Sequence, residues 1–416
     1  MRILFVHNYY GSAAPSGENK VFEAERAMLE KHGHEVVVYA RHSDEIRNGN
    51  VITRLWGMVK GALCTVGNPF AARSVSKLCR EFKPDVVHFH NTFPLISPLA
   101  VRAASKHAPV VMTLHNYRTA CAAGVPTRVG KVCSLCLDKK CVLDGGKYRC
   151  YRGSLLATLP LAVNIAMYRK LLPRWGKRFI VLSEFQKRKM VEYGWSEKKI
   201  VVKGNFINHV EHVEHVEKKD QIVYVGRLSK EKGVETLIKA FAILCGRSET
   251  LAQSIWLKNL KLVIVGDGVD RQELEKLSEG MNVEFTGYKP SEEARRIIAE
   301  SKALVSPSTC WETFGLAAAE AMSVGTPSVV ANLGGLPDIV QDGRFGEVFE
   351  AGNAEACAAA IKRLLNHSDY DEMCEAAKHE AATKYSEEAN YEQLMKIYQD
   401  ATYQQRRSCG RHSKSN

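Results

Sequence analysis

Apolar runs followed by Gly-rich loops and helical segments recur through both halves of the chain, and this pattern most constrains its fold. The chain opens on RILFVHN at residues 2–8, a continuous apolar run typical of a strand buried on both faces. A loop, a helix expected over 21–32 and a second strand, HEVVVYAR, follow. The same order restarts at QIVYVGRLSKEKGVETLIKAF, with a helix expected from Val234. Both repeats are units of a doubly wound parallel sheet, so we predict an α/β chain with two Rossmann-like domains.

The length of 416 residues also suits two domains rather than one core. We expect an N-terminal domain over 1–205, a linker over 206–220 that carries three His-Val-Glu repeats, and a C-terminal domain over 221–385. A last helix over 386–402 is expected to cross back to the N-terminal domain. The tail over 403–416 is expected to be disordered.

The chain is basic, with a formal net charge of +12 and a pI near 9.0. Such a charge suits anionic partners, of which nucleoside diphosphates and anionic lipid surfaces rank above nucleic acid because no nucleic-acid-binding motif is present. No secretory signal precedes the first strand, and no stretch reaches the roughly eighteen apolar residues that span a bilayer. We therefore expect a cytoplasmic protein, with the inner face of the plasma membrane as a candidate location.

The stretch from Ser306 to Val330 places two carboxylates around the start of a helix. Glu312 lies in the loop after the apolar strand ALVSPS, and Glu320 is expected about a turn and a half inside an Ala-rich helix. The first amides of a helix are unpaired donors and provide a seat for phosphate. Carboxylates beside such a seat are suited to sugar hydroxyls, which indicates a nucleotide-sugar site. The alternative is a helix with one Glu near its cap and one solvated Glu.

Cationic residues follow the first strand of the second half. Arg227 and Lys232 lie after that strand and before a helix, where a diphosphate would meet both cations and helix amides.

Three histidines occur at the carboxyl ends of strands in the first half. His88 and His90 alternate on DVVHFH and should face one side, and His115 ends the candidate strand VVMTLH. A strand histidine is more often a structural hydrogen-bonding group than a catalyst, but His115, followed by Asn116, is a candidate for either role. Metal binding by these three histidines is the weaker interpretation.

Five cysteines fall within residues 121–150, and two of them, Cys133 and Cys136, form a C-x-x-C pair. In a reducing compartment, Cys121, Cys133, Cys136 and Cys150 are the candidate ligands of a structural zinc ion, and reduced free thiols are the alternative. An apolar segment over 155–175 with flanking Arg, Lys, Tyr and Trp has two interpretations: an interfacial segment on anionic lipid, or an ordinary core helix.

Taken together, these residues resemble the retaining glycosyltransferases of the GT-B fold, in family 4. The resemblance covers nearly the whole chain, and it is carried most specifically by Gly226-Arg227-Leu228, Lys232-Gly233, Val265-Gly266-Asp267-Gly268, Phe285-Thr286-Gly287-Tyr288, Glu312 to Glu320, and Gly325-Thr326-Pro327. A branch that assembles cell-surface polysaccharides on lipid carriers is similar through Thr113 to Tyr117, the cysteine-bearing loop and Ser183-Glu184-Phe185.

The resemblance implies a role for each matching residue. Arg227 and Lys232 would neutralise the leaving nucleoside diphosphate, and Glu312 would bind the donor sugar beside the amides of Phe314 and Gly315. The remaining implied contacts are the ribose at Glu320, the base at Gly287 and Tyr288, the donor at Gly226, the phosphates and the acceptor near Gly17, and the sugar near His115. Gly17 departs from the common pair of adjacent glycines, because Ser16 precedes it.

The expected reaction is transfer of a sugar, with retention, from a uridine or guanosine diphosphate sugar to a hydroxyl acceptor, with a lipid-linked glycan as the expected acceptor. We expect no catalytic metal, because two cations and a helix N-terminus can take over the charge neutralisation that a divalent ion provides. The rivals are a synthase with a soluble acceptor, a GT-B epimerase and a non-catalytic nucleotide-binding scaffold.

Overall fold

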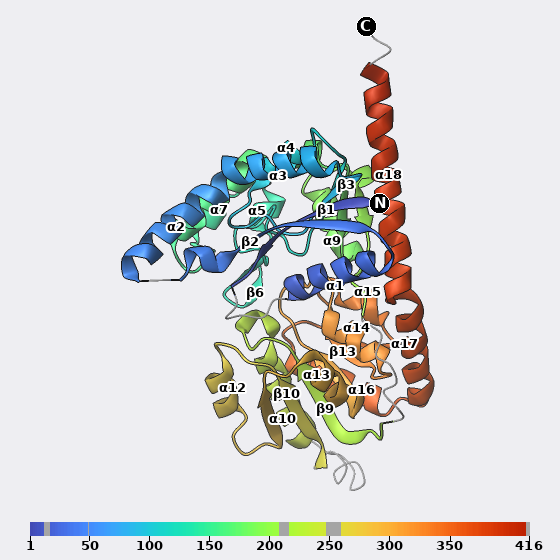
Figure 1. The fold of residues 1–416 in the computed structure, drawn as a ribbon. Helices are drawn as coiled ribbons and strands as arrows, with labels where there is room; N and C mark the ends of the chain where they lie inside the picture. Colours follow the sequence, from blue (N-terminus) through green and yellow to red (C-terminus); the bar gives the residue numbers. More distant parts are fainter. Residues whose placement is uncertain (12–16, 49, 208–215, 247–258, 413–416) are drawn as a thin grey trace. The chain divides into compact units, whose positions relative to one another are not determined.

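The computed structural model describes residues 1–11, 17–48, 50–207, 216–246 and 259–412, with side chains through residue 405 (Figure 1). The chain divides into two compact units. Unit 1 comprises Met1–Pro126, Ser134–Gly204 and Asn390–Asn416, and unit 2 comprises Thr127–Cys133 and Asn205–Ala389.

Unit 1 contains a parallel sheet with the strand order β2-β1-β3-β4-β7-β8. The strands are apolar on both faces, as in Ile3 to Val6, which are fully buried. The order reverses between β1 and β3, and in such sheets ligands bind outside the carboxyl ends of the strands at this switch point. The elements of the first 204 residues are β1 (Arg2–Tyr9), α1 (Gly17–Lys31), β2 (Glu35–His42), α2 (Val51–Val66), α3 (Pro69–Phe82), β3 (Val86–Phe89), α4 (Pro98–Ala104), β4 (Val110–Thr113), β5 (Thr127–Arg128), β6 (Lys131–Val132), α5 (Leu135–Asp138), α6 (Leu143–Lys147), α7 (Leu155–Tyr168), α8 (Leu172–Trp175), β7 (Arg178–Val181), α9 (Glu184–Glu192) and β8 (Ile200–Val202), with 3₁₀ turns at Ser43–Ile46 and Glu197–Lys199.

Unit 2 contains a second parallel sheet with the order β11-β10-β9-β12-β13-β14, in which the switch point lies between β9 and β12. Its core joins these strands to α10 and α16 through residues such as Ile264, Phe241 and Ile361. The elements are β9 (Lys219–Val225), the 3₁₀ turn η3 (Lys230–Lys232), α10 (Val234–Gly246), β10 (Lys261–Val265), α12 (Arg271–Leu277), β11 (Val283–Gly287), α13 (Ser291–Ala299), β12 (Ser301–Ser306), α14 (Leu316–Ser323), β13 (Ser328–Ala331), α15 (Leu336–Val340), β14 (Gly346–Phe349), α16 (Ala354–Leu365) and α17 (Tyr370–Lys384).

The last helix, α18 (Glu387–His412), belongs to unit 1 from Asn390 onward. Its Tyr391 hydroxyl lies 3.0 Å from Nε2 of His34, and its Tyr398 hydroxyl lies 2.7 Å from Nδ1 of His88. The expectation of a disordered tail from 403 is therefore wrong as far as His412, because the helix continues through that segment.

Two further expectations differ from the structure. The segment after β13 contains α15, whose first turn begins at Leu336 and Pro337 and which was not predicted from the sequence. The first helix begins at Gly17 rather than near Val21. The His-Val-Glu repeats of the expected linker lie mostly outside the described residues. Within the described part of the chain, no helix combines the length and hydropathy that crossing a bilayer demands.

Candidate active site

A lysine and a glutamate meet at the switch point of unit 2. Lys232 ends the turn η3 that follows β9, and Glu312 lies in the loop between β12 and α14. The Lys232 Nζ atom lies 2.6 Å from Glu312 Oε1, and the Ser308 hydroxyl donates to the same oxygen at 2.7 Å. The side chains remain 26% and 19% exposed, so a ligand can reach both. The pairing brings together two residues that the sequence assigned to phosphate and to sugar.

Two glycines with positive φ hold the backbone around this pair. Gly233 (φ +69°) lies against Pro307, and a Cβ atom there would be 2.0 Å from the Pro307 carbonyl oxygen. Gly334 (φ +71°) lies against Glu312, and its Cβ atom would be 2.4 Å from the Glu312 nitrogen. The neighbouring Gly335 amide donates to the Glu312 carbonyl at 2.8 Å. Only glycine accommodates both the positive φ and these close approaches. The two glycines therefore fix the backbone positions from which the side chains of Lys232 and Glu312 extend.

The pair is charged at neutral pH. Burial alone would raise the pKa of Glu312, but the Lys232 ammonium and the hydrogen bonds from Lys232 and Ser308 outweigh it and lower that pKa. Burial alone would lower the pKa of Lys232, but Glu312, Cys310 and Tyr224 together raise it. A carboxylate that accepts hydrogen bonds from sugar hydroxyls and an ammonium that binds phosphate must both be in these states.

Arg227 lies beside this pair but makes a different ion pair. Its guanidinium contacts Glu231 at 2.7 Å, and its Nε donates to the Ser229 hydroxyl at 3.3 Å. The Arg227 side chain is 63% exposed. An exposed ion pair of this kind contributes little stability, so a phosphate can replace Glu231 as the partner of Arg227 at small cost.

The other predicted residues of unit 2 lie on neighbouring elements. Gly315 precedes α14 with a φ of +116°, and Glu320 is the fifth residue of that helix. The Phe314 side chain is buried edge-on against Tyr385, so only its backbone amide is a candidate ligand contact. The Gly226 amide donates a hydrogen bond to the Val265 carbonyl at the end of β10. Gly287 is the last residue of β11 and is followed by the half-exposed Tyr288.

The two predicted residues of the first half, Gly17 and His115, belong to unit 1. Gly17 is the exposed first residue of α1, and an added Cβ atom there would meet no atom within 4 Å. His115 follows β4 and is in contact with His90, whose Nδ1 lies 3.0 Å from Nε2 of His115. Burial lowers the pKa of His115 to about 3, with further contributions from His7 and Lys203, so its ring is neutral at physiological pH.

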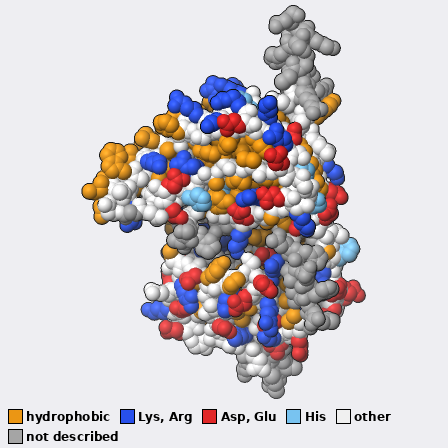
Figure 2. Space-filling model, viewed as in Figure 1, with side chains coloured by type: hydrophobic (Ala, Val, Ile, Leu, Met, Phe, Trp, Pro, Cys, Tyr) orange, Lys and Arg blue, Asp and Glu red, His pale blue; other side chains and the backbone are white. Residues whose placement is uncertain are grey.

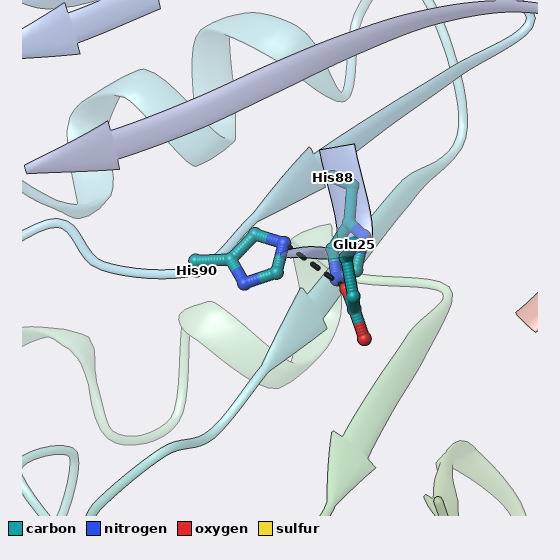
Figure 3. Close-up of side chains that lie close together, drawn as sticks. All are labelled: Glu25, His88 and His90. Atoms are coloured by element: carbon teal, nitrogen blue, oxygen red, sulfur yellow. Dashed lines mark ion pairs between the residues drawn. The ribbon is translucent and has the colours of Figure 1, made fainter. Parts of the chain in front are cut away.

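A buried polar cluster lies beneath His115, at the switch point of unit 1 (Figure 3). Potential ligand atoms of Glu25, His88 and His90 lie within 4.8 Å of one another. A metal ion does not suit them, because both ring nitrogens of His88 have partners, the Tyr398 hydroxyl and the Thr113 hydroxyl. In addition, the Lys203 ammonium is already 2.6 Å from Glu25 Oε1, where it would repel a cation.

Sequence reasoning did not single out Glu25 as a functional residue. On α1, Glu25 is buried in line with Val21, Phe22, Met28 and Leu29. A carboxylate within such an apolar stripe is the signal that could have identified it, since buried charges require partners.

Glu18, one residue after Gly17, was also missed. Burial raises the pKa of Glu18 to about 8, and its Oε2 accepts from the side-chain amide of Asn116 at 3.3 Å. The Glu18 carboxyl group thus contacts Asn116, which follows His115 in the sequence. Carboxyl groups with a perturbed pKa are common at functional sites.

The cysteine-bearing segment forms β5, β6, α5 and α6 rather than one long loop. Cys121 and Cys136 are buried, and burial raises their pKa values to about 11 and about 12. Among the described residues, the four candidate cysteines do not form a group of close ligand atoms of the kind seen at Glu25. A structural zinc ion stays a prediction, and metal analysis of the purified protein would test it.

An Asp-x-Asp sequence, the usual metal motif of other sugar transferases, occurs at Asp369 to Asp371. It lies at the start of α17, where the Tyr370 hydroxyl donates to the Lys302 carbonyl at the beginning of β12. Glu312 follows the other end of the same strand, so these aspartates are not placed to hold a metal ion beside it.

Two family models match consecutive parts of the chain. The model described as Glycosyltransferase Family 4 matches residues 17–211, and the model described as Glycosyl transferases group 1 matches residues 206–401. Together they cover both units.

Curated relatives match mainly over one part of the chain. The sulfoquinovosyl transferase of Arabidopsis thaliana is 33% identical over 171 residues, which are 40% of this chain and 31% of that protein. An uncharacterized glycosyltransferase of Methanocaldococcus jannaschii is 30% identical over 201 residues, 47% of each chain. A GDP-mannose-dependent alpha-mannosyltransferase of Corynebacterium glutamicum is 34% identical over 160 residues, 38% of this chain and 35% of that protein. The chain thus spans a third to a half of the length of these relatives.

Solved structures match over nearly the whole chain. The Anabaena protein HepE, in complex with UDP and glucose, is 18% identical with a TM-score of 0.60, over 95% of this chain and 98% of that one. Sucrose-phosphate synthase from Thermosynechococcus elongatus is 16% identical with a TM-score of 0.64, over 96% and 98%. At these sequence identities, the similarity to the solved structures shows a shared fold. With the two family models, they show that the chain belongs to the group 1 glycosyltransferases with the GT-B fold.

Proposed function

We propose that this protein transfers a sugar from a nucleoside diphosphate sugar to a hydroxyl acceptor, with retention of configuration. The observation that carries the proposal is the contact between Lys232 and Glu312 at the switch point of unit 2. A cation and a carboxylate that share one accessible position suit a ligand with phosphates at one end and hydroxyls at the other. The names of the relatives support the donor class, since one is GDP-mannose-dependent and the HepE structure contains UDP and glucose.

The chemistry follows from the charges that develop during the reaction. Cleavage of the bond between the sugar and the diphosphate leaves negative charge on the phosphate and positive character on the anomeric carbon. Lys232, Arg227 and the first amides of α14 would stabilise the phosphate, as preorganised donors do in other enzymes. Glu312 would orient the sugar through its hydroxyls. The acceptor hydroxyl would attack from the side on which the phosphate departs, and that phosphate would take the hydroxyl proton.

Product analysis tests the reaction and its stereochemistry together. The protein is incubated with UDP- and GDP-sugars and with lipid-linked or soluble acceptors, and the product is examined by NMR. We expect the anomeric configuration of the donor to be kept. An inverted product would contradict retention, free sugar without acceptor would favour the epimerase alternative, and turnover of soluble acceptors alone would favour the synthase.

A lipid-linked acceptor is favoured by an exposed apolar surface on unit 1. The helix α2 buries its stripe of small residues, Gly57, Gly61 and Thr65, and turns its large apolar residues outward. Figure 2 shows these hydrophobic side chains gathered over the end of unit 1 where Figure 1 labels α2. The exposed residues of α2 are Val51, Ile52, Leu55, Trp56, Met58, Val59 and Leu63, with exposed fractions between 44% and 83%.

The segment 155–175 contributes to the same surface. Its helix α7 contacts α2, and the Asn164 side chain donates to the Thr65 carbonyl at 2.6 Å. One face of α7 packs in the core, as the core-helix interpretation expects, while Leu155, Leu156 and Leu159 are exposed and are available to the proposed lipid contact. With the exposed Arg54 and Lys60 on α2, we propose that this surface binds anionic lipid, where such helices lie in the interface.

Replacing Trp56 and Leu63 with Ser is expected to weaken binding to vesicles that contain phosphatidylglycerol by about tenfold or more, because each large side chain contributes on the order of 1.5–3 kcal/mol when fully buried. Co-sedimentation measures the change. The matched control replaces Val269 and Leu277, exposed apolar residues of unit 2, with Ser and should bind as the wild type does. Equal vesicle binding by all three proteins would contradict the proposed lipid surface.

A further inference from the structure

A cavity of about 60 Å³ lies in unit 1 beside the carboxyl ends of β3 and β4. The described residues that line it all belong to unit 1. Its walls are largely apolar and come from β4, α7 and α8, through Met112, Leu161, Ile165 and Leu172. By the same measure a water molecule requires roughly 10–15 Å³, so the cavity admits a group about the size of a phosphate.

Two arginines that line this cavity have no carboxylate partner. Arg169 directly follows α7, and its side chain makes no ion pair or hydrogen bond with any residue that the structure describes. Arg118 donates to the neutral carbonyls of Ala122 at 3.1 Å and Ala123 at 3.5 Å, and its guanidinium carbon lies 4.3 Å from the centre of the Phe93 ring. Carbonyls and a ring face hold the Arg118 side chain in place, but they do not neutralise its charge.

Glu18 is the acidic group whose pKa the charge of Arg118 affects, and it is largely uncharged at neutral pH. Burial raises the pKa of Glu18 to about 8, and the Arg118 charge opposes that rise only in part. Glu18 Oε2 accepts from the Asn116 side chain at 3.3 Å, as the carbonyl oxygen of a protonated carboxyl group can. The charge of Arg118 therefore remains available to an anion.

Three residues that line the cavity carry buried polar atoms without a hydrogen-bond partner in the described ranges. These atoms are Nε1 of Trp195, Nε of Arg118 and Oγ1 of Thr119. The Trp195 side chain is only 5% exposed, and buried polar atoms almost always have a partner. Since an indole N–H and a guanidinium N–H can only donate, the missing partner must be an acceptor. Phosphate oxygens are acceptors, and the arginine guanidinium matches their geometry.

The helices that form the exposed apolar surface of unit 1 also form a wall of this cavity. Thr65 of α2 and Leu161 and Ile165 of α7 line it, while other residues of the same two helices are exposed. The bond from the Asn164 side chain to the Thr65 carbonyl joins the helices at the cavity itself. A ligand that is anionic at one end and apolar at the other therefore suits the arginines and the helices together.

We propose that this cavity binds the phosphate group of a lipid-linked acceptor, with Arg118 and Arg169 as its cationic contacts and the Trp195 indole N–H as a further donor. The apolar chain of the acceptor lies against α7. This inference rests on the proposed function and deepens it, because it names the group by which unit 1 recognises the acceptor. The role is one of binding, and no bond to the phosphate is formed or broken.

Calorimetric titration of the full-length protein with geranyl phosphate, geraniol and inorganic phosphate separates the contributions of charge and chain. We expect geranyl phosphate to bind at least about tenfold more tightly than either of the others, because it alone satisfies both the arginines and the apolar wall. Arg169→Gln should raise the Kd for geranyl phosphate by about tenfold or more. The matched control is Arg174→Gln, which replaces an exposed arginine of α8 outside the cavity lining and should leave the Kd unchanged.

The indole N–H resonance of Trp195 reports the location of the ligand. It is assigned by its absence from the spectrum of Trp195→Phe, which keeps an aromatic ring and removes the donor. We expect geranyl phosphate to shift this resonance in the wild-type protein. Trp195→Phe should raise the Kd about threefold to tenfold, as for the loss of one hydrogen bond.

Four results would overturn the inference in whole or in part. Equal affinity for inorganic phosphate and geranyl phosphate would assign the cavity to free phosphate instead of a lipid. Equal affinity for geraniol and geranyl phosphate would remove the phosphate from the proposal. An unchanged Kd in Arg169→Gln, or an unmoved Trp195 resonance at saturation, would place the ligand outside the cavity. Arg169 is half-buried and has no side-chain partner among the described residues, so this variant is expected to fold even if Trp195→Phe does not.

These measurements distinguish failure of the cavity from failure of the proposed function, because binding requires neither a donor nor transfer. A protein that binds geranyl phosphate through Arg169 but transfers no sugar would contradict the proposed function and keep the phosphate site. A protein that transfers sugar to a soluble acceptor and does not bind geranyl phosphate would keep the function and contradict the site.

Discussion

The Lys232→Ala variant is expected to lower kcat/KM for sugar transfer by about two to three orders of magnitude, equivalent to about 2.7–4 kcal/mol of transition-state stabilisation. The reason is that Lys232 lies within hydrogen-bond distance of Glu312, at the position where the sugar and its diphosphate join in the proposed complex. Removing the ammonium takes away a cation that is already in place before the phosphate departs. Steady-state kinetics with the preferred donor measures the loss.

A neighbouring lysine provides the matched control for this experiment. Lys230 lies in the same turn and is exposed, with no side-chain ion pair among the described residues. Lys230→Ala should keep kcat/KM within a few-fold of the wild-type value. A thermal melt accompanies each variant, because Lys232→Ala leaves Glu312 with Ser308 as its remaining side-chain partner in the site. A folded Lys232→Ala protein with wild-type kinetics would contradict the role assigned to Lys232.

Unit 1 is expected to lose about 2–3 kcal/mol of stability when the pH falls from 6.5 to 5.5. Burial lowers the pKa of His7 to about 4, that of His115 to about 3, and those of His88 and His90 well below their usual value. The unfolded chain therefore binds protons below pH 6.5 that the folded unit does not, and stability falls with pH. Each such histidine loses up to about 1.4 kcal/mol per pH unit.

One carboxyl group opposes this trend. Burial raises the pKa of Glu18 to about 8. Its contribution to the stability of unit 1 is therefore present at low pH, and it is lost as the pH rises from the pKa of the unfolded chain to about 8. Acidification from pH 6.5 to 5.5 therefore increases the stability of unit 1 by about 1.3 kcal/mol through Glu18, whereas the four histidines together decrease it by about 4 kcal/mol.

Hydrogen exchange in urea, followed on peptides from β1 and β3, measures the stability of unit 1 separately from that of unit 2. His7→Gln should reduce the pH slope by about one proton, whereas replacement of the exposed His379 of unit 2 with Gln should leave it unchanged. A stability of unit 1 that is flat between pH 6.5 and 5.5 would show that the buried histidines do not resist protonation.

The fold and the positions of Lys232 and Glu312 after their strands could be predicted from the sequence, for physical reasons. Strands buried on both faces are continuous apolar runs, so β1 and β9 could be recognised directly. Lys232 and Glu312 follow two strands that flank a switch point, and local pattern alone placed each after its strand. Their contact, across 80 residues of sequence, became an expectation only through the resemblance to a known family.

The parts that the sequence did not predict depend on contacts between distant segments. Glu25 pairs with Lys203, which is 178 residues away in the sequence. The sequence around either residue does not indicate which residue is its partner. The outward face of α2 was missed for a different reason. A helix with apolar residues all round is usually buried, but here Gly57 and Gly61 allow Ile46 to approach closely, so the small residues take the inner face. The extension of α18 through His412 was missed because its polar sequence resembles a solvated tail.

The central claim is that unit 2 binds a nucleoside diphosphate through Lys232, and calorimetric titration tests it most directly. UDP, GDP, ADP and the corresponding monophosphates are titrated separately into the wild type and into Lys232→Ala. We predict that at least one diphosphate binds the wild type, that its monophosphate binds more weakly, and that Lys232→Ala raises the Kd of the diphosphate by about tenfold or more. No binding by any diphosphate, or an unchanged Kd in a folded Lys232→Ala protein, would contradict the claim.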